Sequence, residues 1–389
     1  MPPLDVTLAG LSLAAWLHLV FANGRFWLCD QRLDGRQAAP ERWPSVVAVV
    51  PARNEVDVIA RSVGSLLDQD YPGPFRIVLV DDESEDGTAA EAERVAKGHE
   101  RGHRLVVERT GERPEGWVGK MWAVHNGVQR AEIEAPHAEY WLLTDADVAH
   151  SRGNLRRLVA KAEGERLELV SLMVRLHADT RLEQLLVPAF VYFFQKLYPF
   201  PRVNDPTSRT AAAAGGCALV RCAALARAGG IESLRSEIID DCALGAAIKR
   251  DGRIWLGLAE TERSIRAYGG VGGVWRMVTR SAFTQLHHSW LLLAGTLLGL
   301  ALLYVVPPVL VAAAPLGAAP LAVGVAAAAW GLMAASFVPT LALYGRSAWW
   351  GFALPLAGLL YAGMTLDSAR RHAQSRGAEW KGRPGAGAV

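Results

Sequence analysis

Acidic residues stand directly after two apolar runs in the middle of the chain. The first run ends at Val80 and is followed by Asp81–Asp86, with five carboxylates in six positions. The second run, Tyr140–Thr144, is followed by Asp145-Ala146-Asp147. Carboxylates at i and i+2 of an extended segment point the same way, which suits a hard divalent cation and the phosphate oxygens that it binds. One Asp-x-Asp is common on surface loops, but two acidic strand ends in one sheet predict a ligand site.

The stretch Ser84–Thr88 has a simpler explanation as the start of a helix. Ser84 or Asp86 would then be the N-cap, and the acids would interact favourably with the helix dipole. This accounts for Asp86 but not for Asp81 and Asp82, which stand at the end of the strand. We therefore expect Asp81 and Asp82 to contact a ligand.

The elements that must position these acids follow from the pattern between residues 45 and 268. Short β-branched runs alternate there with amphipathic stretches, which predicts a largely parallel sheet with helices on both faces. Ligands of such sheets bind beyond the carboxyl ends of the strands. The expected strands are Val46–Val50, Arg76–Val80, Arg104–Glu108 and Tyr140–Thr144, and the expected helices are 56–69, 87–99, 119–131 and 152–163.

Apolar residues make up 51% of the 389 residues and are concentrated near both ends. Four runs with almost no charge are each about long enough to cross roughly 30 Å of hydrocarbon. This excludes a fully soluble enzyme. The runs are Leu4–Ala22, Ser289–Ala314, Leu321–Tyr344 and Trp349–Leu366.

The first apolar run has no basic residue ahead of it and no small-residue cleavage site, so we expect a retained anchor rather than a signal peptide. Arginines at positions 25, 32, 36 and 42 put the following domain in the cytoplasm by the positive-inside rule. Basic residues after 366 also favour the inside, whereas three further crossings would leave the tail outside. Either the last run is interfacial, or Ser289–Ala314 folds as a hairpin at Pro307-Pro308.

Charge and cysteine content argue against two further classes of protein. A formal net charge of +2 gives no support to a nucleic-acid-binding protein, which needs an excess of Lys and Arg. The four cysteines form no Cys-x-x-Cys pair, so neither a disulfide framework nor a zinc site is indicated. A reducing, cytosolic setting fits this pattern.

Five motifs in this order resemble glycosyltransferase family two, the inverting enzymes with the GT-A fold. The resemblance covers about residues 45 to 270 and implies a nucleotide diphosphate sugar donor. The motifs are Pro51-Ala52-Arg53-Asn54-Glu55, Val80-Asp81-Asp82-Glu83-Ser84-Glu85-Asp86-Gly87-Thr88, Gly119-Lys120-Met121-Trp122-Ala123, Asp145-Ala146-Asp147 and Asp240-Asp241-Cys242-Ala243-Leu244-Gly245.

The resemblance implies that five residues at or after the ends of the first two strands hold the uracil and ribose of a UDP-linked donor. The residues at these positions are Ala52, Arg53, Glu55, Asp81 and Asp82. Carboxylates are natural acceptors for base N–H groups and ribose hydroxyls.

The diphosphate and its metal are the next implied contacts. Lys120 would approach the nucleotide as a point charge, although a solvated lysine at a helix start is the plainer interpretation. Asp147 would coordinate Mn²⁺ or Mg²⁺, with Asp145 beside it toward the sugar. The metal would stabilise the leaving UDP as a Lewis acid.

Asp241 matches the position of the family's general base, which takes the proton of the acceptor hydroxyl. Asp240 stands beside it, and its charge would raise the proton affinity of the pair. A plain helix N-terminus is the alternative for both. Gly215 and Gly216 resemble an acceptor-side glycine strand that permits close backbone approach, and an ordinary bulge is the alternative.

The segment before the C-terminal apolar runs lacks the Gln-x-x-Arg-Trp motif of the family's processive synthases, which favours transfer of a single sugar. Trp275, Arg276 and Arg280 would then contact donor phosphate or a lipid headgroup, or form only a basic interfacial helix. The apolar, aromatic segment Leu185–Phe200 suggests contact with the membrane or a core helix. The four apolar runs favour a membrane lipid as acceptor.

A narrower resemblance, carried by the stretch from Glu115 to Ala123, is to glycosyltransferases associated with hopanoid biosynthesis. It implies a triterpenoid polyol as acceptor, with a polyprenyl phosphate or a glycerolipid as the competing interpretation. A non-catalytic scaffold that binds nucleotide sugar is the hypothesis from another class. Asp82, Asp145, Asp147 and Asp241 together favour the enzyme, while the identity of the sugar and the oligomeric state stay open.

We therefore expect a multi-pass protein of a bacterial-type inner membrane with a cytoplasmic catalytic domain. Its expected parts are an anchor (1–24), a basic linker (25–44), a GT-A domain (45–268), an interfacial segment (269–288), a transmembrane region of about three helices (289–366) and a basic, disordered tail (367–389).

Overall fold

The computed structural model describes residues 3–33, 35, 37–374, 379–380 and 383–384. The chain divides into two compact units, each built from segments that are separate in the sequence. The sheet unit comprises Gln31–His177 and Arg202–Ala267, with the described residues of Gly377–Val389. The helical unit comprises Met1–Asp30, Ala178–Pro201 and Tyr268–Arg376.

An eight-stranded sheet in the order β3-β2-β1-β4-β7-β6-β8-β5 forms the centre of the sheet unit. Its parallel pairs are β1 with β2 and β4, β2 with β3, and β6 with β8; β7 is antiparallel to β4 and β6, and β5 to β8. This confirms the predicted α/β class with a mostly parallel sheet. The strands are β1 (Val46–Ala52), β2 (Phe75–Asp81), β3 (Leu105–Arg109), β4 (Tyr140–Thr144), β5 (Val148–Ala149), β6 (Leu169–Arg175), β7 (Cys217–Arg221) and β8 (Ile254–Ser264), with a separate pair β9 (Glu379–Trp380) and β10 (Arg383–Pro384).

Helices cover both faces of this sheet because alternate strand residues point to opposite sides. Ala48 of β1 belongs to the hydrophobic cluster that contains Ile59 of α2, whereas Val49 lies against Gly127 of α4. The helices are α2 (Val56–Leu67), α3 (Thr88–Lys97), α4 (Gly119–Glu134), α5 (Asn154–Glu165), α8 (Cys222–Arg227) and α9 (Asp240–Lys249).

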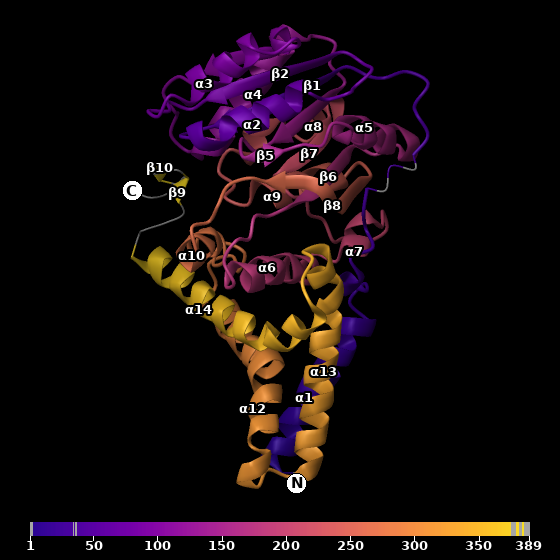
Figure 1. The fold of residues 1–389 in the computed structure, drawn as a ribbon, viewed down its shortest axis with the longest axis vertical. Helices are drawn as coiled ribbons and strands as arrows, with labels where there is room; N and C mark the ends of the chain where they lie inside the picture. The colour runs from indigo at the N-terminus through magenta and orange to yellow at the C-terminus, as the bar shows by residue number, and fades with distance from the viewer. Residues whose placement is uncertain (1–2, 34, 36, 375–378, 381–382, 385–389) are drawn as a thin grey trace. The chain divides into compact units, whose positions relative to one another are not determined.

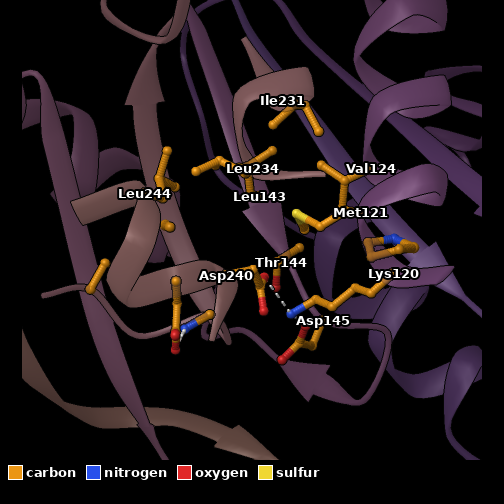
Figure 2. Close-up of a pocket in the computed structure, with 15 residues that line it drawn as sticks. Lys120, Met121, Val124, Leu143, Thr144, Asp145, Ile231, Leu234, Asp240 and Leu244 are labelled. Atoms are coloured by element: carbon orange, nitrogen blue, oxygen red, sulfur yellow. Dashed lines mark hydrogen bonds and ion pairs between the residues drawn. The ribbon is translucent and has the colours of Figure 1, made fainter. Parts of the chain in front are cut away.

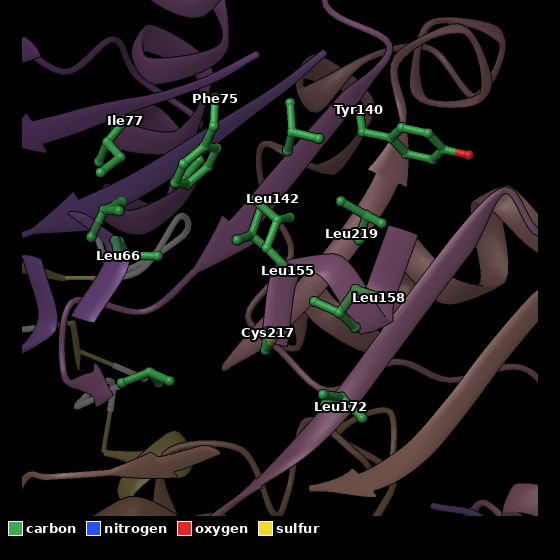
Figure 3. Packing of buried hydrophobic residues seen from close by; sticks show 14 of the residues in the cluster. Leu66, Phe75, Ile77, Tyr140, Leu142, Leu155, Leu158, Leu172, Cys217 and Leu219 are labelled. Atoms are coloured by element: carbon green, nitrogen blue, oxygen red, sulfur yellow. The ribbon is translucent and has the colours of Figure 1, made fainter. Parts of the chain in front are cut away.

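The core of the sheet unit joins strands on both sides of β4. Leu155 and Leu158 of α5 belong to one buried cluster with Leu142 of β4 and Leu219 of β7 (Figure 3). All four side chains are almost completely buried. This packing fixes the end of β4, after which the acidic turn follows.

The strand and helix positions expected from the sequence match β1–β4 and α2–α5 within a few residues. The sequence did not predict β5, β6 or β8, whereas β7 directly follows Gly215 and Gly216, where a glycine strand was expected. These strands form the second half of the sheet, and β7 enters it between β4 and β6.

The helical unit contains α1 (Leu4–Phe21), α6 (Glu183–Leu197), α10 (Val271–Thr279), α11 (Trp290–Leu300), α12 (Val306–Ala312), α13 (Pro320–Leu343) and α14 (Leu354–Ala373). The short helix α7 (Phe200–Asn204) lies where the chain passes from one unit to the other. Within this unit α1, α12 and α13 lie side by side, and α14 runs across them (Figure 1). Of the described residues, four helical stretches are long and apolar enough to cross a membrane: Leu4–Phe21, Trp290–Ala312, Pro320–Leu343 and Ala348–Ala373.

Residues 178–201 group with the terminal helices, although they fall inside the range 45–268 that was expected for one domain. The reason is aromatic packing of α6: Tyr192 contacts the rings of Phe26 and Phe337 at 5.2 Å between centroids. Toward the C-terminus, α14 continues to Ala373, beyond the expected boundary at 366. Much of the expected tail lies outside the described residues.

The hairpin considered at Pro307-Pro308 does not form, because Trp290–Ala312 is one continuous helical stretch. A π-helical turn over Ala301–Val305 joins α11 to α12 just before the two prolines. Such a wide turn is a common way for a helix to accommodate a local break in its hydrogen bonds.

Candidate functional site

A pocket opens in the sheet unit at the carboxyl end of β4, where charged side chains meet an apolar wall. Figure 2 shows Lys120, Asp145 and Asp240 gathered on one side and the apolar residues on the other. The lining residues are Pro51, Lys120, Met121, Val124, Leu143, Thr144, Asp145, Ala213, Gly215, Ala218, Ile231, Leu234, Asp240, Asp241 and Leu244. The pocket thus brings together residues from four of the five predicted motifs.

Lys120 lies in the first turn of α4 and bridges two acids of the pocket. Its Nζ lies 3.1 Å from Asp145 Oδ1 and 3.1 Å from Asp240 Oδ2. Burial of the ammonium alone would lower the pKa of Lys120, but the charges of Asp145, Asp240 and Asp241 outweigh it and raise this pKa. Lys120 is therefore a fixed positive charge, not the solvated lysine of the plainer interpretation.

Asp241 lies in the first turn of α9 and is held by backbone donors. Its Oδ2 accepts a hydrogen bond from the Gly215 N–H at 3.0 Å, and its Oδ1 accepts one from the Cys242 N–H at 2.8 Å. Burial, and then the neighbouring charge of Asp240, raise the pKa of Asp241 to about 6. A carboxyl group with this pKa is ionised at neutral pH and can still accept a proton efficiently.

Gly215 and Gly216 form a turn before β7 rather than part of a strand or a bulge within it. A Cβ at Gly215 would lie 3.3 Å from Lys120 Nζ, and one at Gly216 would lie only 2.7 Å from Val174 Cγ2. The missing side chains allow the backbone to approach the charged groups closely. Asp241 needs this approach for its bond to Gly215.

Asp145 and Asp147 lie in a turn between β4 and β5, not on the extended segment that the sequence suggested. The Val148 N–H donates to the Asp145 carbonyl at 3.2 Å, which closes the turn. The two carboxylates contact different cations. Asp145 contacts Lys120, and Asp147 contacts Arg266. Burial raises the pKa of Asp145, although Lys120 opposes the shift.

Asp147 belongs to a second charged group at the end of β8. Its Oδ2 accepts a hydrogen bond from Ser264 Oγ at 2.9 Å and lies 3.2 Å from Arg266 Nε. Arg266 Nη2 also forms an ion pair with Glu55, whose side chain is only 7% exposed. Arg266 thus connects the acid after β1 with the acid after β4.

The residues after β1 and β2 form one connected edge. The Asp82 N–H donates to the Ala52 carbonyl at 2.9 Å, and Asp82 Oδ1 accepts a hydrogen bond from Thr110 Oγ1 at 3.0 Å. Arg53 donates to the Asp82 carbonyl and lies 3.8 Å from its Oδ2. Asp81 Oδ1 accepts the N–H of Ser84 at 3.3 Å, so this acid supports the loop.

Asp86 supports the start of α3, but neither Asp86 nor Ser84 is the predicted N-cap, because Gly87 holds that position. Its carboxylate accepts hydrogen bonds from the N–H groups of Thr88 and Val56 at 3.0 Å each. Burial opposes ionisation, but these bonds outweigh it and lower the pKa of Asp86. The helix itself begins at Thr88, after Gly87 with a φ of 90°.

Trp275, Arg276 and Arg280 belong to the helical unit, on α10 and at its end. Trp275 Nε1 donates to Asp367 Oδ2 at 2.9 Å, which ties α10 to α14. The side chains of Arg276 and Arg280 are exposed.

Sequence reasoning missed Thr110, Ser264 and Arg266. Thr110 directly follows β3, and Ser264 ends β8. The rule that ligand residues follow strand ends would have found Thr110, since Arg104–Glu108 was an expected strand. It could not find Ser264 or Arg266, because β8 itself was not predicted.

The donor atoms around Asp147 fit a hard divalent cation. Within the described part of the chain, no three His, Cys, Asp or Glu side chains come together as a preformed metal cluster. Magnesium-type sites that hold nucleotides commonly use one or two carboxylates and complete their shell with water and phosphate oxygens. Asp147, with Asp145 across the turn, supplies such a partial set.

Comparison with known proteins gives a family. Residues 47–229 match the model described as Glycosyl transferase family 2. This segment of the chain is similar to glycosyltransferase family 2. The sheet unit has the GT-A fold. The matched segment contains the acids after β1, β2 and β4, and ends before Asp240.

One of two similar solved structures, a mannosyltransferase, supports the fold of the chain. The mannosyltransferase PcManGT from Pyrobaculum calidifontis, in complex with GDP-Man and Mn²⁺, is 20% identical, with a TM-score of 0.56 over 92% of this chain and 99% of that chain. The structure of S. aureus TarS 1-349 in complex with UDP is 20% identical, with a TM-score of 0.39 over 61% of this chain and 65% of that one. No curated protein sequence matches the chain closely enough to count as a relative.

Proposed function

We propose that this protein is a metal-dependent, inverting glycosyltransferase. Its proposed reaction moves a single sugar from a nucleotide diphosphate sugar, in which the nucleotide is UDP, to a membrane lipid at the cytoplasmic leaflet. The observation that carries the proposal is Asp241. It is a carboxylate at the pocket, oriented by the Gly215 N–H at 3.0 Å, with a pKa raised to about 6. An inverting transfer needs one base of this kind.

In the proposed reaction Asp241 accepts the proton of the acceptor hydroxyl. The hydroxyl oxygen forms a bond to the anomeric carbon on the face opposite the leaving group, and the bond to the diphosphate breaks with its electrons on the phosphate oxygen. Lys120, fixed between Asp145 and Asp240, keeps a positive charge beside this centre. A divalent cation held by Asp147, with Asp145 alongside, would stabilise the leaving diphosphate as a Lewis acid.

The charge balance of the site supports the metal requirement. Two cations, Lys120 and Arg266, face the carboxylates of Glu55, Asp145, Asp147, Asp240 and Asp241. With every group ionised, the net charge is −3. A site of this charge repels a diphosphate unless a cation enters with it.

The recognition of the nucleoside is assigned to the edge after β1 and β2. Ala52, Arg53, Glu55, Asp81 and Asp82 gather there around two strand ends. Carboxylate and backbone oxygens of this edge suit base N–H groups and ribose hydroxyls. The mannosyltransferase of similar fold was solved with GDP-Man and Mn²⁺, which makes GDP-linked sugars the natural comparison for UDP-linked ones.

The lipid acceptor is supported by four helical stretches of membrane-spanning length and composition. Trp275, Arg276 and Arg280, on an element of that helical unit, are the candidates for headgroup contact. A hopanoid polyol is the first acceptor to test because of the resemblance carried by residues 115–123.

The test is detection of glycosylated lipid by mass spectrometry with the purified full-length protein. Reactions contain Mn²⁺, UDP- and GDP-sugars, and separate hopanoid, polyprenyl phosphate and glycerolipid acceptors. We expect a new lipid with a UDP-sugar, and we expect Asp241→Asn to reduce its rate by about 10²–10⁴-fold, because that variant loses the base. Nucleotide binding should stay within a few-fold of the unchanged protein.

Asp251→Asn is the matched control, since Asp251 is an exposed acid just after the other end of α9. Product with only a polyprenyl phosphate or a glycerolipid would redirect the acceptor. If no donor yields product while nucleotide sugar still binds, the protein is a scaffold and the proposal fails.

A further inference from the structure

Arg266 is held in place by the chain ahead of it. Strand β8 ends at Ser264, which pairs with Val148 of β5. The next residue, Ile265, donates its N–H to the Asp147 carbonyl at 2.8 Å. These bonds lock the start of the Arg266 side chain beside Asp147, which lies 3.2 Å from the guanidinium.

The Arg266 guanidinium contacts the carboxylate of Asp147, which is the group proposed to bind the metal. Asp147 Oδ2 accepts from Ser264 and contacts Arg266, and Glu55 takes the other arm of the guanidinium. The side chains of Glu55 and Asp147 are 7% and 16% exposed, so little water screens this cluster. A divalent cation on Asp147 would therefore meet a like charge at close range.

The conflict is relieved if the guanidinium has a second partner when the site is loaded. Arg266 itself is 35% exposed, more than either acid that it contacts. A guanidinium binds phosphate oxygens with two parallel hydrogen bonds. A diphosphate that enters with the metal offers such oxygens at the place where the charges meet.

We propose that Arg266 exchanges partners: without ligand it neutralises Asp147 and Glu55 and competes with the metal, and in the loaded enzyme it binds the diphosphate of the donor. This inference rests on the proposed function and adds a nucleotide-binding residue to it. It couples the two ligands, because a metal bound at Asp147 would free the Arg266 guanidinium and the diphosphate would then bind it. Metal without diphosphate, or diphosphate without metal, should therefore bind more weakly than the two do together.

The test measures two affinities of the full-length protein in detergent: Mn²⁺ alone, by electron paramagnetic resonance of the free ion, and UDP at saturating Mn²⁺, by calorimetry. Arg266→Ala should bind Mn²⁺ more tightly, on the order of tenfold, because a hydrogen-bonded cation no longer covers Asp147. The same variant should bind UDP more weakly by on the order of tenfold. A residue that only braces the site would lower both affinities together.

Arg266→Lys is the second variant, because it retains a charge for buried Glu55 but cannot form the two-armed contact. It should shift both affinities in the same directions by a smaller factor. Arg263→Ala is the matched control. Arg263 lies three residues earlier on β8, is exposed, and alternates to the other face of the strand.

Opposite changes in the two affinities support the exchange. Unchanged or weaker Mn²⁺ binding in both Arg266 variants, or unchanged UDP binding, would overturn it while leaving the glycosyltransferase proposal intact. Failure of the unchanged protein to bind either Mn²⁺ or UDP would instead overturn both proposals.

Discussion

Asp241 combines two features that a general base needs, a fixed direction and a proton affinity near neutrality. The direction comes from the N–H groups of Gly215 and Cys242. The proton affinity comes from burial and from Asp240 next to it. Because Lys120 contacts Asp240 at 3.1 Å, it limits how far that charge can act. The direction and the proton affinity of the proposed base are thus set by four neighbouring groups rather than by its own residue type.

The pH dependence of turnover follows from this arrangement. The raised pKa of about 6 means that Asp241 is protonated, and inactive as a base, at lower pH. At saturating Mn²⁺ and donor, the rate should fall about tenfold per pH unit below 6 and be level just above it. Asp240→Asn should move the midpoint downward, since it removes a neighbouring negative charge. Asp251→Asn should leave it in place; a rate that does not change through pH 6 contradicts the assignment.

At this scale the sequence indicated the acids and two cations that contact them, Arg53 and Lys120, but it missed Arg266. Asp82, Asp145, Asp147 and Asp241 stand directly after apolar runs or at a helix start, so their types and positions suffice to find them. Arg266 meets Asp147 across 119 positions of sequence, and no local pattern reports that contact. The turn that holds Asp145 and Asp147 was also missed, because an Asp-x-Asp pattern does not distinguish a turn from an extended strand end.

Among the elements, α4 packs closely against the sheet at Gly127. A Cβ on Gly127 would lie 2.4 Å from Val49 Cγ1 and 2.7 Å from Val80 Cγ2, so only glycine lets α4 approach β1 and β2 this closely. The same helix begins at Gly119 and presents Lys120 to the pocket. The packing of one face therefore sets the position of a charge in the site.

Substitution of this glycine tests the packing. Gly127→Ala should lower the stability of the sheet unit by about 1–3 kcal/mol, because strand methyl groups must move. Gly64→Ala on α2 is the matched control, since a Cβ there meets nothing within 4 Å. The control should be neutral or stabilising by up to about 1 kcal/mol, as expected for alanine in a helix. Thermal unfolding of both variants measures the difference, and equal midpoints would contradict it.

The first four strands were predictable because each is a short β-branched or aromatic run followed by a turn or an acid. β6 and β8 are parallel neighbours formed from Leu169–Arg175 and Ile254–Ser264, with a long excursion between them. β7 joins the two halves of the sheet by antiparallel pairing on both sides. Such pairing depends on tertiary contacts and leaves little trace in the local sequence.

At the scale of the whole molecule, the course of the last apolar stretch bears on the conflict over the basic C-terminal residues. After α13 the chain folds back along that helix: Trp330 Nε1 donates to the Phe352 carbonyl at 3.3 Å, and a Cβ on Gly351 would lie 2.6 Å from the Ala334 carbonyl. α14 then leads away, and Ser368 Oγ donates to the Thr279 carbonyl at 2.6 Å. The fourth apolar stretch therefore ends beside the segment that precedes α11, and we expect it to enter the membrane and return to the same side.

Cysteine labelling distinguishes three crossings from four. Leu316 lies between α12 and α13 and is 86% exposed. The variant Leu316→Cys should react with a membrane-impermeant maleimide that is added outside cells. Gln374→Cys, after α14, should react only once the cells are permeabilised. Thr207→Cys in the sheet unit is the control for the cytoplasmic side. Cys222, the native cysteine that is not buried, is replaced by serine. Labelling of Gln374→Cys in intact cells would show that α14 crosses.

The order of segments along the chain has a consequence for synthesis on the ribosome. Asp147 is made early, but Ser264 follows it by 117 residues, and α6 of the helical unit is translated between them. β5 occupies the edge of the sheet and pairs with β8, so the acidic turn gains its partners only when β8 has emerged. A nascent chain that has not passed β8 therefore has its first strands but not the assembled acidic turn that is proposed to bind a metal. We expect such a chain to leave nucleotide sugars unconsumed until β8 has been made, after α1 and α6.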